Sequence, residues 1–303
     1  MNQPVHRVGV VGAGLMGSGI AEVCARAGLD VLVFEIDAQA LAAGRERVER
    51  SLARAVRGGR LGGPERDKAL GRLRWTTDLS DFADRELVLE AVAESERIKT
   101  EVFARLDRVV EDPDAILASN SSSIPMVKLA TATSRPDRVI GVHFFNPVPV
   151  LPLVELVPSL LTAERTAERA EAFVTGVLGK RVIRAGDRAG FVVNALLVPY
   201  LLSAIRMLES GFASAADIDQ GMVQGCAHPL GPLALADLIG LDTVQAIAES
   251  MYQEYKEPLY SPPPLLARMV QAGLLGRKSG RGFHDYAAAA GAAGVAEVAV
   301  QTT

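Results

Sequence analysis

The sequence predicts an α/β protein in which a domain with a mostly parallel sheet precedes an all-helical domain. Three observations predict this fold. A glycine-rich turn joins an apolar run to a helical segment near the N-terminus, short apolar runs then alternate with helical segments as far as residue 184, and strand signals vanish from Phe191 onward. We therefore place the α/β domain at 1–186, the helical domain at 187–286 and a disordered tail at 287–303, which is rich in alanine.

The first element is the glycine-rich turn within residues 8–35, which read VGVVGAGLMGSGIAEVCARAGLDVLVFE. The pattern G-x-G-x-x-G stands between an apolar run and a helix expected at 20–27, and a second apolar run follows at 31–34. Strand, tight turn, helix and strand within about 30 residues is the context of dinucleotide binding in a Rossmann-like domain. The residues predicted to hold the pyrophosphate are Gly12, Gly14, Leu15, Met16 and Gly17.

The end of the second apolar run predicts which dinucleotide binds. Glu35 stands there, and a carboxylate can accept hydrogen bonds from both ribose hydroxyls but repels a 2′-phosphate. The sequence therefore predicts NAD as the cofactor rather than NADP. Asp37 is a second candidate for the same role.

The other elements of the α/β domain follow from apolar runs and helical spacing. The expected strands are 75–77, 87–92, 115–118, 139–142, 153–157 and 181–184, and the expected helices are 42–61, 65–73, one beginning at 94, and 162–178. The helix that begins at Glu94 is expected to bury a face formed by Ile98, Val102, Leu106 and Val109. Thr162 is expected to cap the last of these helices.

In the second domain, proline and glycine separate the helical segments. The expected helices are 191–210, 215–224, 233–255 and 265–272. The run 191–202 is more apolar than one small helical domain needs to bury, which predicts a homodimer formed through this domain.

Composition limits the possible function classes. The net charge of −4 argues against a nucleic-acid-binding surface, and no run reaches the roughly 18 apolar residues of a membrane helix. Neither of the two cysteines has a C-x-x-C partner, so we expect no disulfide framework and no metal site. These features predict a cytoplasmic protein without membrane or nucleic-acid partners.

His143 is the strongest candidate for acid–base chemistry. It follows the expected strand 139–142 and precedes a proline-rich turn, and histidine exchanges protons near neutral pH. Glu155 lies among apolar residues in the expected strand 153–157, where an unpaired carboxylate is costly and a histidine is a natural partner. In the alternative interpretation His143 makes one structural hydrogen bond and Glu155 faces water on an edge strand.

Two further segments carry polar groups that suit a substrate oxygen. Residues 119–123 offer hydroxyls and an amide at the end of an expected strand, although such residues also cap helices. Asn194 is an amide within an apolar helical run, where it could donate to a carbonyl or serve a helix contact.

Arginines recur along one side of the expected helix 42–61. They stand at 47, 50, 54 and 57, spacings that place them on one face. Such a stripe suits phosphate oxygens, and it is equally consistent with a solvated helix face.

Together these motifs resemble the short-chain L-3-hydroxyacyl-CoA dehydrogenases, and among them the bacterial 3-hydroxybutyryl-CoA type most closely. The matching segments are GAGLMG, SNSSS, HFFNPVP, LVELV, GFVVN, HPLGPL and GRKSGRGFHDY, in this order from residue 12 to residue 286. The resemblance implies an NAD-dependent, reversible oxidation of a (3S)-3-hydroxyacyl-CoA to the 3-ketoacyl-CoA, in a homodimer.

The resemblance also implies roles for particular residues. It makes His143 the catalytic acid/base, oriented by Glu155, and places Ser122 and Asn194 at the reacting end of the substrate. The residues implied at the nicotinamide side of the cofactor are Glu94, Lys99 and Asn120, Asn146 is a further cofactor-binding residue, and those implied for CoA are Ser51, Arg54 and Arg57.

Two other functions fit the same sequence. A dehydrogenase of a free hydroxy acid, such as an L-gulonate-type enzyme, would share the architecture but would not need the arginine stripe. A non-catalytic NAD-binding protein would not need His143 and Glu155, which are both present.

Overall fold

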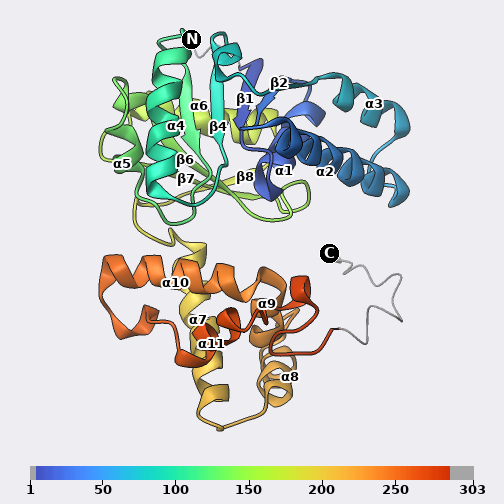
Figure 1. The fold of residues 1–303 in the computed structure, drawn as a ribbon, viewed down its shortest axis with the longest axis vertical. Helices are drawn as coiled ribbons and strands as arrows, with labels where there is room; N and C mark the ends of the chain where they lie inside the picture. Colours follow the sequence, from blue (N-terminus) through green and yellow to red (C-terminus); the bar gives the residue numbers. More distant parts are fainter. Residues whose placement is uncertain (1–4, 287–303) are drawn as a thin grey trace. The chain divides into compact units, whose positions relative to one another are not determined.

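The computed structural model describes residues 5–286, which form two compact units divided between Phe191 and Val192 (Figure 1). The division falls close to the expected domain boundary after residue 186, and the expected tail at 287–303 lies outside the described residues.

One sheet of eight strands forms the centre of the first unit, in the order β3-β2-β1-β4-β5-β6-β7-β8. The strands are β1 Arg7–Val11, β2 Asp30–Phe34, β3 Leu73–Thr76, β4 Leu87–Glu90, β5 Ile116–Ser119, β6 Val139–Phe144, β7 Leu153–Pro158 and β8 Arg181–Arg184. Neighbouring strands are parallel except for β6 and β7, which are antiparallel. The predicted mostly parallel sheet is thus confirmed.

Helices cover both faces of this sheet. They are α1 Leu15–Arg26, α2 Ala38–Arg57, α3 Gly63–Gly71, α4 Glu96–Val109, α5 Met126–Ala130 and α6 Glu164–Ala172, with short turns η1 Leu79–Phe82 and η2 Pro136–Arg138 and a π-helical segment η3 Phe173–Val177. One core joins the sheet to α1, α2, α3 and α6, and the other joins it to α4 and α5. Strand alternation supplies both cores: in β1, Val8 and Val10 belong to the first core and Val11 to the second.

Two helix boundaries differ from those predicted, for identifiable reasons. Helix α1 begins at Leu15 rather than at residue 20, because the glycine turn leads directly into it. Helix α2 covers 38–57 rather than 42–61: the Asp37 carboxylate accepts a hydrogen bond from Ala40 N at 2.8 Å and starts the helix, and Gly58 caps its end.

Two details of helix packing differ from what the sequence predicts. The predicted stripe of α4 packs on the core, with Leu106 buried and Val102 and Val109 partly buried, but Lys99 and Phe103 are buried beside it. Apolar spacing alone does not reveal a buried lysine. Thr162 does not cap α6, because its hydroxyl donates to the carbonyl oxygen of Val139 at 2.6 Å and Ala163 is the N-cap residue.

Helices form most of the described part of the second unit, as predicted, and isolated β-bridges join Gly276 to Arg281 and Arg281 to Asp285. Its elements are α7 Val193–Glu209, α8 Ala215–Cys226, α9 Pro232–Ile239, α10 Leu241–Tyr255, η4 Pro258–Tyr260, α11 Pro264–Gln271 and η5 Arg277–Ser279. The expected helix 233–255 is two helices, since Gly240 adopts φ +103° between them. Across residues 5–286, every helix is too short or too polar to cross a membrane.

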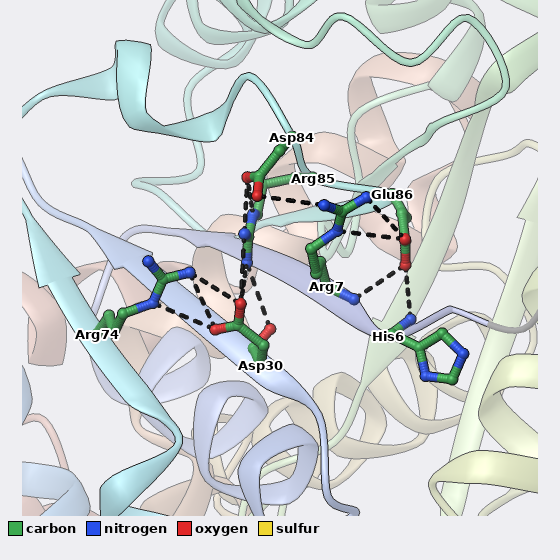
Figure 2. A network of polar contacts seen from close by, with 7 residues as sticks. All are labelled: His6, Arg7, Asp30, Arg74, Asp84, Arg85 and Glu86. Atoms are coloured by element: carbon green, nitrogen blue, oxygen red, sulfur yellow. Dashed lines mark hydrogen bonds and ion pairs between the residues drawn. The ribbon is translucent and has the colours of Figure 1, made fainter.

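A network of charged side chains ties together the amino ends of the first strands, at the edge of the sheet opposite to the glycine turn (Figure 2). Arg85 is fully buried, and its guanidinium lies 2.7 Å from Asp84 and 3.4 Å from Asp30. Arg74 pairs with Asp30 at 2.8 Å, and Arg7 pairs with Glu86 at 3.1 Å. These contacts fix the strand starts and leave the carboxyl ends to form the site.

Candidate active site

The glycine turn has the geometry needed to admit a pyrophosphate. Gly12 has φ +92°, and a Cβ at Gly17 would lie 1.8 Å from the carbonyl oxygen of Gly12, so the turn is tight and α1 packs against it. A Cβ at Gly14 would meet no atom within 4 Å, which marks open space beside the turn. Helix α1 starts at Leu15 and Met16 without a side-chain cap, so its first N–H groups suit an anion.

Glu35 directly follows β2 and is held against this turn. Its Oε1 accepts a hydrogen bond from Ala13 N at 2.6 Å, and its Oε2 accepts one from Ile36 N at 3.1 Å. Asp37, the second candidate, instead caps α2. The carboxylate beside the predicted ribose position is therefore that of Glu35.

A buried ion pair lies at the carboxyl end of β4. Lys99 is 1% exposed and Glu90 is fully buried, and Lys99 Nζ donates to Glu90 Oε1 at 2.6 Å. Glu90 Oε1 also accepts from Val92 N at 2.7 Å, and its Oε2 accepts from Ser119 Oγ at 2.6 Å. Sequence reasoning selected Lys99 but missed Glu90, although a charged residue that ends the apolar run 87–89 was a visible signal.

Glu94 gathers the serine segment that follows β5. Its Oε1 accepts hydrogen bonds from Ser121 Oγ at 2.6 Å, from Ser122 N at 3.0 Å and from Ser123 Oγ at 3.1 Å. Burial by itself raises the pKa of Glu94, but nearby Lys99 and the serine hydrogen bonds outweigh it, so the pKa lies below its ordinary value. Glu94 is therefore an ionised anchor, and it fixes the backbone and hydroxyl of Ser122.

Asn120 links this segment to β6. Its Oδ1 accepts a hydrogen bond from Phe144 N at 2.8 Å, next to His143 in sequence. The amide oxygen is thus engaged, and the NH₂ group remains the donor that the side chain can offer. The structure brings the predicted residues Glu94, Lys99 and Asn120 into one polar network.

His143 and Glu155 form a buried pair. The sequence predicted that His143 follows the strand 139–142, but the residue lies within β6. It stands opposite Glu155 in the antiparallel register with β7. Nδ1 of the imidazole is 2.7 Å from Glu155 Oε2, with His143 6% exposed and Glu155 fully buried. The interpretation of Glu155 as a solvent-facing residue on an edge strand is wrong, since β7 lies between β6 and β8.

Two aromatic rings hold the imidazole, and neither was predicted. The ring centroids of Phe145 and Phe191 lie 4.7 Å and 5.5 Å from that of His143, both at edge-to-face angles. Phe191 has φ +47°, a left-handed conformation that is strained for a bulky side chain. The surrounding structure keeps this residue in a rare conformation beside the histidine, which suggests a functional reason.

Two further predicted site residues are Asn146 and Asn194. Asn146 is exposed and precedes a cis peptide bond to Pro147. Asn194 is buried in the first turn of α7, in the helical unit. Both remain predictions for cofactor and substrate contacts.

The arginines of α2 do not act as one stripe. Arg47 Nη1 donates to the carbonyl oxygen of Ala13 in the glycine turn at 3.0 Å, and Arg50 pairs with Glu46 at 2.8 Å. Arg54 and Arg57 are exposed on the same helix. The phosphate-binding capacity of α2 is thereby concentrated in its last turn.

The arrangement can bind a dinucleotide and move a proton next to it. The glycine turn after β1, the Glu35 carboxylate after β2 and His143 near the end of β6 lie where parallel strands of the sheet end, which is where ligands bind in such sheets, and Glu155 on antiparallel β7 faces His143 there. Within residues 5–286, no three His, Cys, Asp or Glu side chains are grouped as they would be to hold a metal ion.

Known proteins resemble this chain over most of its length. The family described as "3-hydroxyacyl-CoA dehydrogenase, NAD binding domain" matches residues 7–188, and the corresponding C-terminal domain matches residues 190–286. A 3-hydroxybutyryl-CoA dehydrogenase of Mycobacterium tuberculosis is 63% identical over 286 residues, covering 94% of this chain and all of the relative. The human mitochondrial hydroxyacyl-coenzyme A dehydrogenase is 39% identical over 93% of this chain and 91% of its own.

Solved structures show the same similarity. The crystal structure of M. tuberculosis FadB2 has a TM-score of 0.93 at 63% identity and covers 94% of this chain and all of that one. The (S)-3-hydroxybutyryl-CoA dehydrogenase of Ralstonia eutropha has a TM-score of 0.87 at 45% identity and covers 93% of this chain and 99% of that one.

Proposed function

This chain belongs to the 3-hydroxyacyl-CoA dehydrogenase family, an NAD-dependent family, and from this premise we propose that its substrate is (3S)-3-hydroxybutyryl-CoA, oxidised reversibly to acetoacetyl-CoA. Relatives named for that substrate, at 63% and 45% identity, support this choice. The observation that carries the chemistry is the 2.7 Å contact between His143 and Glu155 at the carboxyl end of the sheet.

His143 acts as the acid/base in this proposal. The Glu155 carboxylate accepts a hydrogen bond from Nδ1–H, which leaves Nε2 as the basic nitrogen that takes the hydroxyl proton of the substrate. The imidazolium that results is stabilised by the buried carboxylate. NAD, when bound, supplies the acceptor for the hydride of C3. In the reverse direction, Nε2 returns the proton.

The remaining site residues take positioning roles. Ser122 and Asn194 would hold the oxygens of the reacting end, and Glu94, Lys99, Asn120 and Asn146 would line the nicotinamide side of the cofactor. Ser122 is held by Glu94 and Asn120 by Phe144, which supports fixed positions for both. The CoA nucleotide would lie along α2 at Ser51, Arg54 and Arg57, where exposed guanidinium groups suit its phosphates.

A comparison of two substrates tests this proposal. NADH oxidation is followed with acetoacetyl-CoA and with free acetoacetate, in the wild type and in His143→Ala. We expect turnover with the thioester alone and its loss in the variant. Turnover with acetoacetate at the same efficiency would favour a free hydroxy acid, and binding of NADH without turnover of either would indicate a non-catalytic protein.

We also propose a homodimer formed through the helical unit, in the cytoplasm and acting in fatty-acid metabolism. A cleft of about 350 Å³ between α7 and α8 is lined almost entirely by apolar atoms, and Phe212, next to it in sequence, is 80% exposed. An apolar cleft beside an exposed phenylalanine suits a second copy of the same surface. Light scattering at micromolar concentration should give a dimer, and Phe212→Asp should shift it toward the monomer; a wild-type monomer would contradict the proposal.

A further inference from the structure

Glu90 is a buried carboxylate that the proposed reaction does not use. It accepts hydrogen bonds from Lys99 Nζ, Val92 N and Ser119 Oγ at 2.6–2.7 Å, and its side chain is fully buried. Three donors directed at two oxygens hold the carboxylate in one orientation. Such a group must have a counter-charge, and Lys99 provides it.

The cluster around Lys99 is not neutral. Lys99 Nζ also lies 3.4 Å from Glu94 Oε2, so one buried ammonium stands between two carboxylates. Glu90 and Glu94 contribute −1 each and Lys99 +1, which leaves one net negative charge on the charge cluster of Glu90, Lys99 and Glu94. Water screens the buried charges of Glu90 and Lys99 little. The Glu94 side chain is 38% exposed, so its charge acts over several ångströms at reduced strength.

The charge cluster lies at the crevice where the cofactor is expected. Strand β4 is the neighbour of β1, and Glu90 is the register partner of Val11, the residue before the glycine turn. Ala91 is close enough that a Cβ on Gly12 would lie 2.8 Å from its carbonyl oxygen. The strand order reverses between β1 and β4, and a dinucleotide binds at that switch point.

We propose that Glu90 is a positioning residue that holds Lys99 and sets the net charge at the nicotinamide end of the site. The charge cluster thereby stabilises the bound oxidised cofactor more than the bound reduced one. The inference rests on the proposed function, because it requires NAD at this crevice. The nicotinamide ring of NAD⁺ carries a positive charge that NADH lacks. One net negative charge nearby therefore stabilises bound NAD⁺ more than bound NADH, and Glu90 shifts the balance between them without touching either.

Glu90→Gln tests this by removing one charge while keeping the shape of the side chain. We expect the Kd of NAD⁺ to rise by roughly 3- to 30-fold, the effect of one charge within a site at an effective dielectric constant of about 20. The Kd of NADH should change much less. Calorimetry gives the first constant and NADH fluorescence the second, both without turnover, and thermal unfolding confirms that the variant is folded.

Glu86→Gln is the matched control. Glu86 precedes the same strand but lies at its amino end, bound to Arg7, so its replacement removes an equal charge far from the crevice (Figure 2). It should leave the ratio of the two dissociation constants unchanged. An equal weakening of both cofactors by Glu90→Gln would show that Glu90 only supports the structure and would overturn the proposal.

A double variant keeps the test decisive if the first is unstable. Glu90→Gln combined with Lys99→Met removes both members of the buried ion pair and leaves the cluster at −1. The ratio should therefore stay near the wild-type value, even if both affinities fall. The proposal is contradicted if the ratio of the NAD⁺ and NADH dissociation constants does not change with the net charge of the charge cluster. A wild type that binds neither cofactor contradicts the proposed function instead.

Discussion

His143 and Glu155 stand opposite each other in the antiparallel pair of β6 and β7, and the 2.7 Å contact between Nδ1 and Oε2 is a direct consequence of that register. Side chains that face each other across two strands lie on the same face of the sheet at a fixed spacing. The pair is therefore preorganised by backbone hydrogen bonds rather than by a mobile loop. A rigid base is what proton transfer to a bound substrate requires.

Replacement of either member of this pair should lower turnover. His143→Ala should lose about 10²–10⁴-fold in kcat, the usual effect of removing a general acid or base, while the Kd of NADH stays close to the wild-type value. Glu155→Gln should lower kcat and change the pH dependence of turnover, because the imidazolium loses its buried counter-charge. Steady-state kinetics across a range of pH check both, and an unchanged profile in Glu155→Gln would mean that the two side chains do not work as a pair.

Cofactor choice should depend on Glu35, which is held at the glycine turn by Ala13 N. The wild type should use NADH in clear preference to NADPH, and Glu35→Gln should narrow that preference because the repulsion of a 2′-phosphate is lost. Asp37→Asn is the matched control, since Asp37 caps α2 and should affect thermal stability alone. Equal kcat/KM for NADH and NADPH in the wild type would refute the role of Glu35.

The sequence predicted the parts of the site that local patterns determine. Residues 8–35 carry their turn, helix and strands in the spacing of glycines and apolar runs, and Glu155 was identifiable because a carboxylate within an apolar strand needs a partner. The antiparallel insertion of β7, which makes His143 and Glu155 register partners, is a tertiary feature that no local pattern encodes. Sequence spacing therefore predicted the pair but not the geometry that fixes it.

Other parts of the site depend on contacts between distant segments. Phe191 packs against His143 across a separation in sequence that periodicity cannot detect, and its positive φ has no signature in a phenylalanine. The burial of Lys99 on α4 was not predicted, because Lys99 takes a core position through its ion pair with Glu90. Hydrophobic periodicity alone does not predict which polar side chains are buried as pairs inside the protein.

Phe191 should matter for catalysis rather than for cofactor binding. Phe191→Ala removes the ring that contacts the imidazole edge-to-face, an interaction of about 0.5–1.5 kcal/mol, and frees His143 to adopt other orientations. We expect kcat to fall by roughly tenfold, with the Kd of NADH unchanged, in stopped-flow and equilibrium measurements. Phe191→Tyr keeps the ring and should retain most of the activity; an equal loss in both variants would show that the ring itself is not what matters.

Glu22 should make stability depend on pH. It is 1% exposed on α1, and its Oε2 has no hydrogen-bond partner among the described residues, while Arg26 lies 3.4 Å from its Oε1. Burial raises the pKa of Glu22 above its ordinary value, although Ser51, Arg26 and Arg54 oppose the shift. The folded protein therefore holds this proton more tightly than the unfolded chain does.

The sign of the effect follows from linkage. The contribution of Glu22 to stability is fully present below its unfolded pKa and is lost as pH rises through the folded value. The Tm of Glu22→Gln minus the Tm of the wild type should therefore increase as pH rises from about 4.5 toward neutrality. A Tm difference between Glu22→Gln and the wild type that stays constant across this pH range would mean that the pKa of Glu22 is the same in both states.

The CoA assignment makes Arg54 and Arg57 the most informative basic residues. Both are exposed at the end of α2, whereas Arg47 is engaged by the glycine turn and Arg50 by Glu46. Neutralising Arg54 and Arg57 together, as glutamines, should raise the KM for acetoacetyl-CoA by roughly 3- to 30-fold, the range expected for charge-assisted contacts to phosphate. The effect should shrink at high salt, because exposed charges are screened.

Two comparisons isolate the phosphate contribution in steady-state assays. The KM for a truncated acetoacetyl thioester that lacks the nucleotide should not change in the double variant, since this substrate has no phosphate for the arginines to bind. Arg45→Gln is the matched control on the same helix: nine residues at about 100° each place it on the opposite side from Arg54, where it pairs with Glu49. It should leave KM unchanged. If replacing Arg54 and Arg57 raises the KM equally for both thioesters, these arginines act through folding or the cofactor, and α2 does not hold the CoA nucleotide.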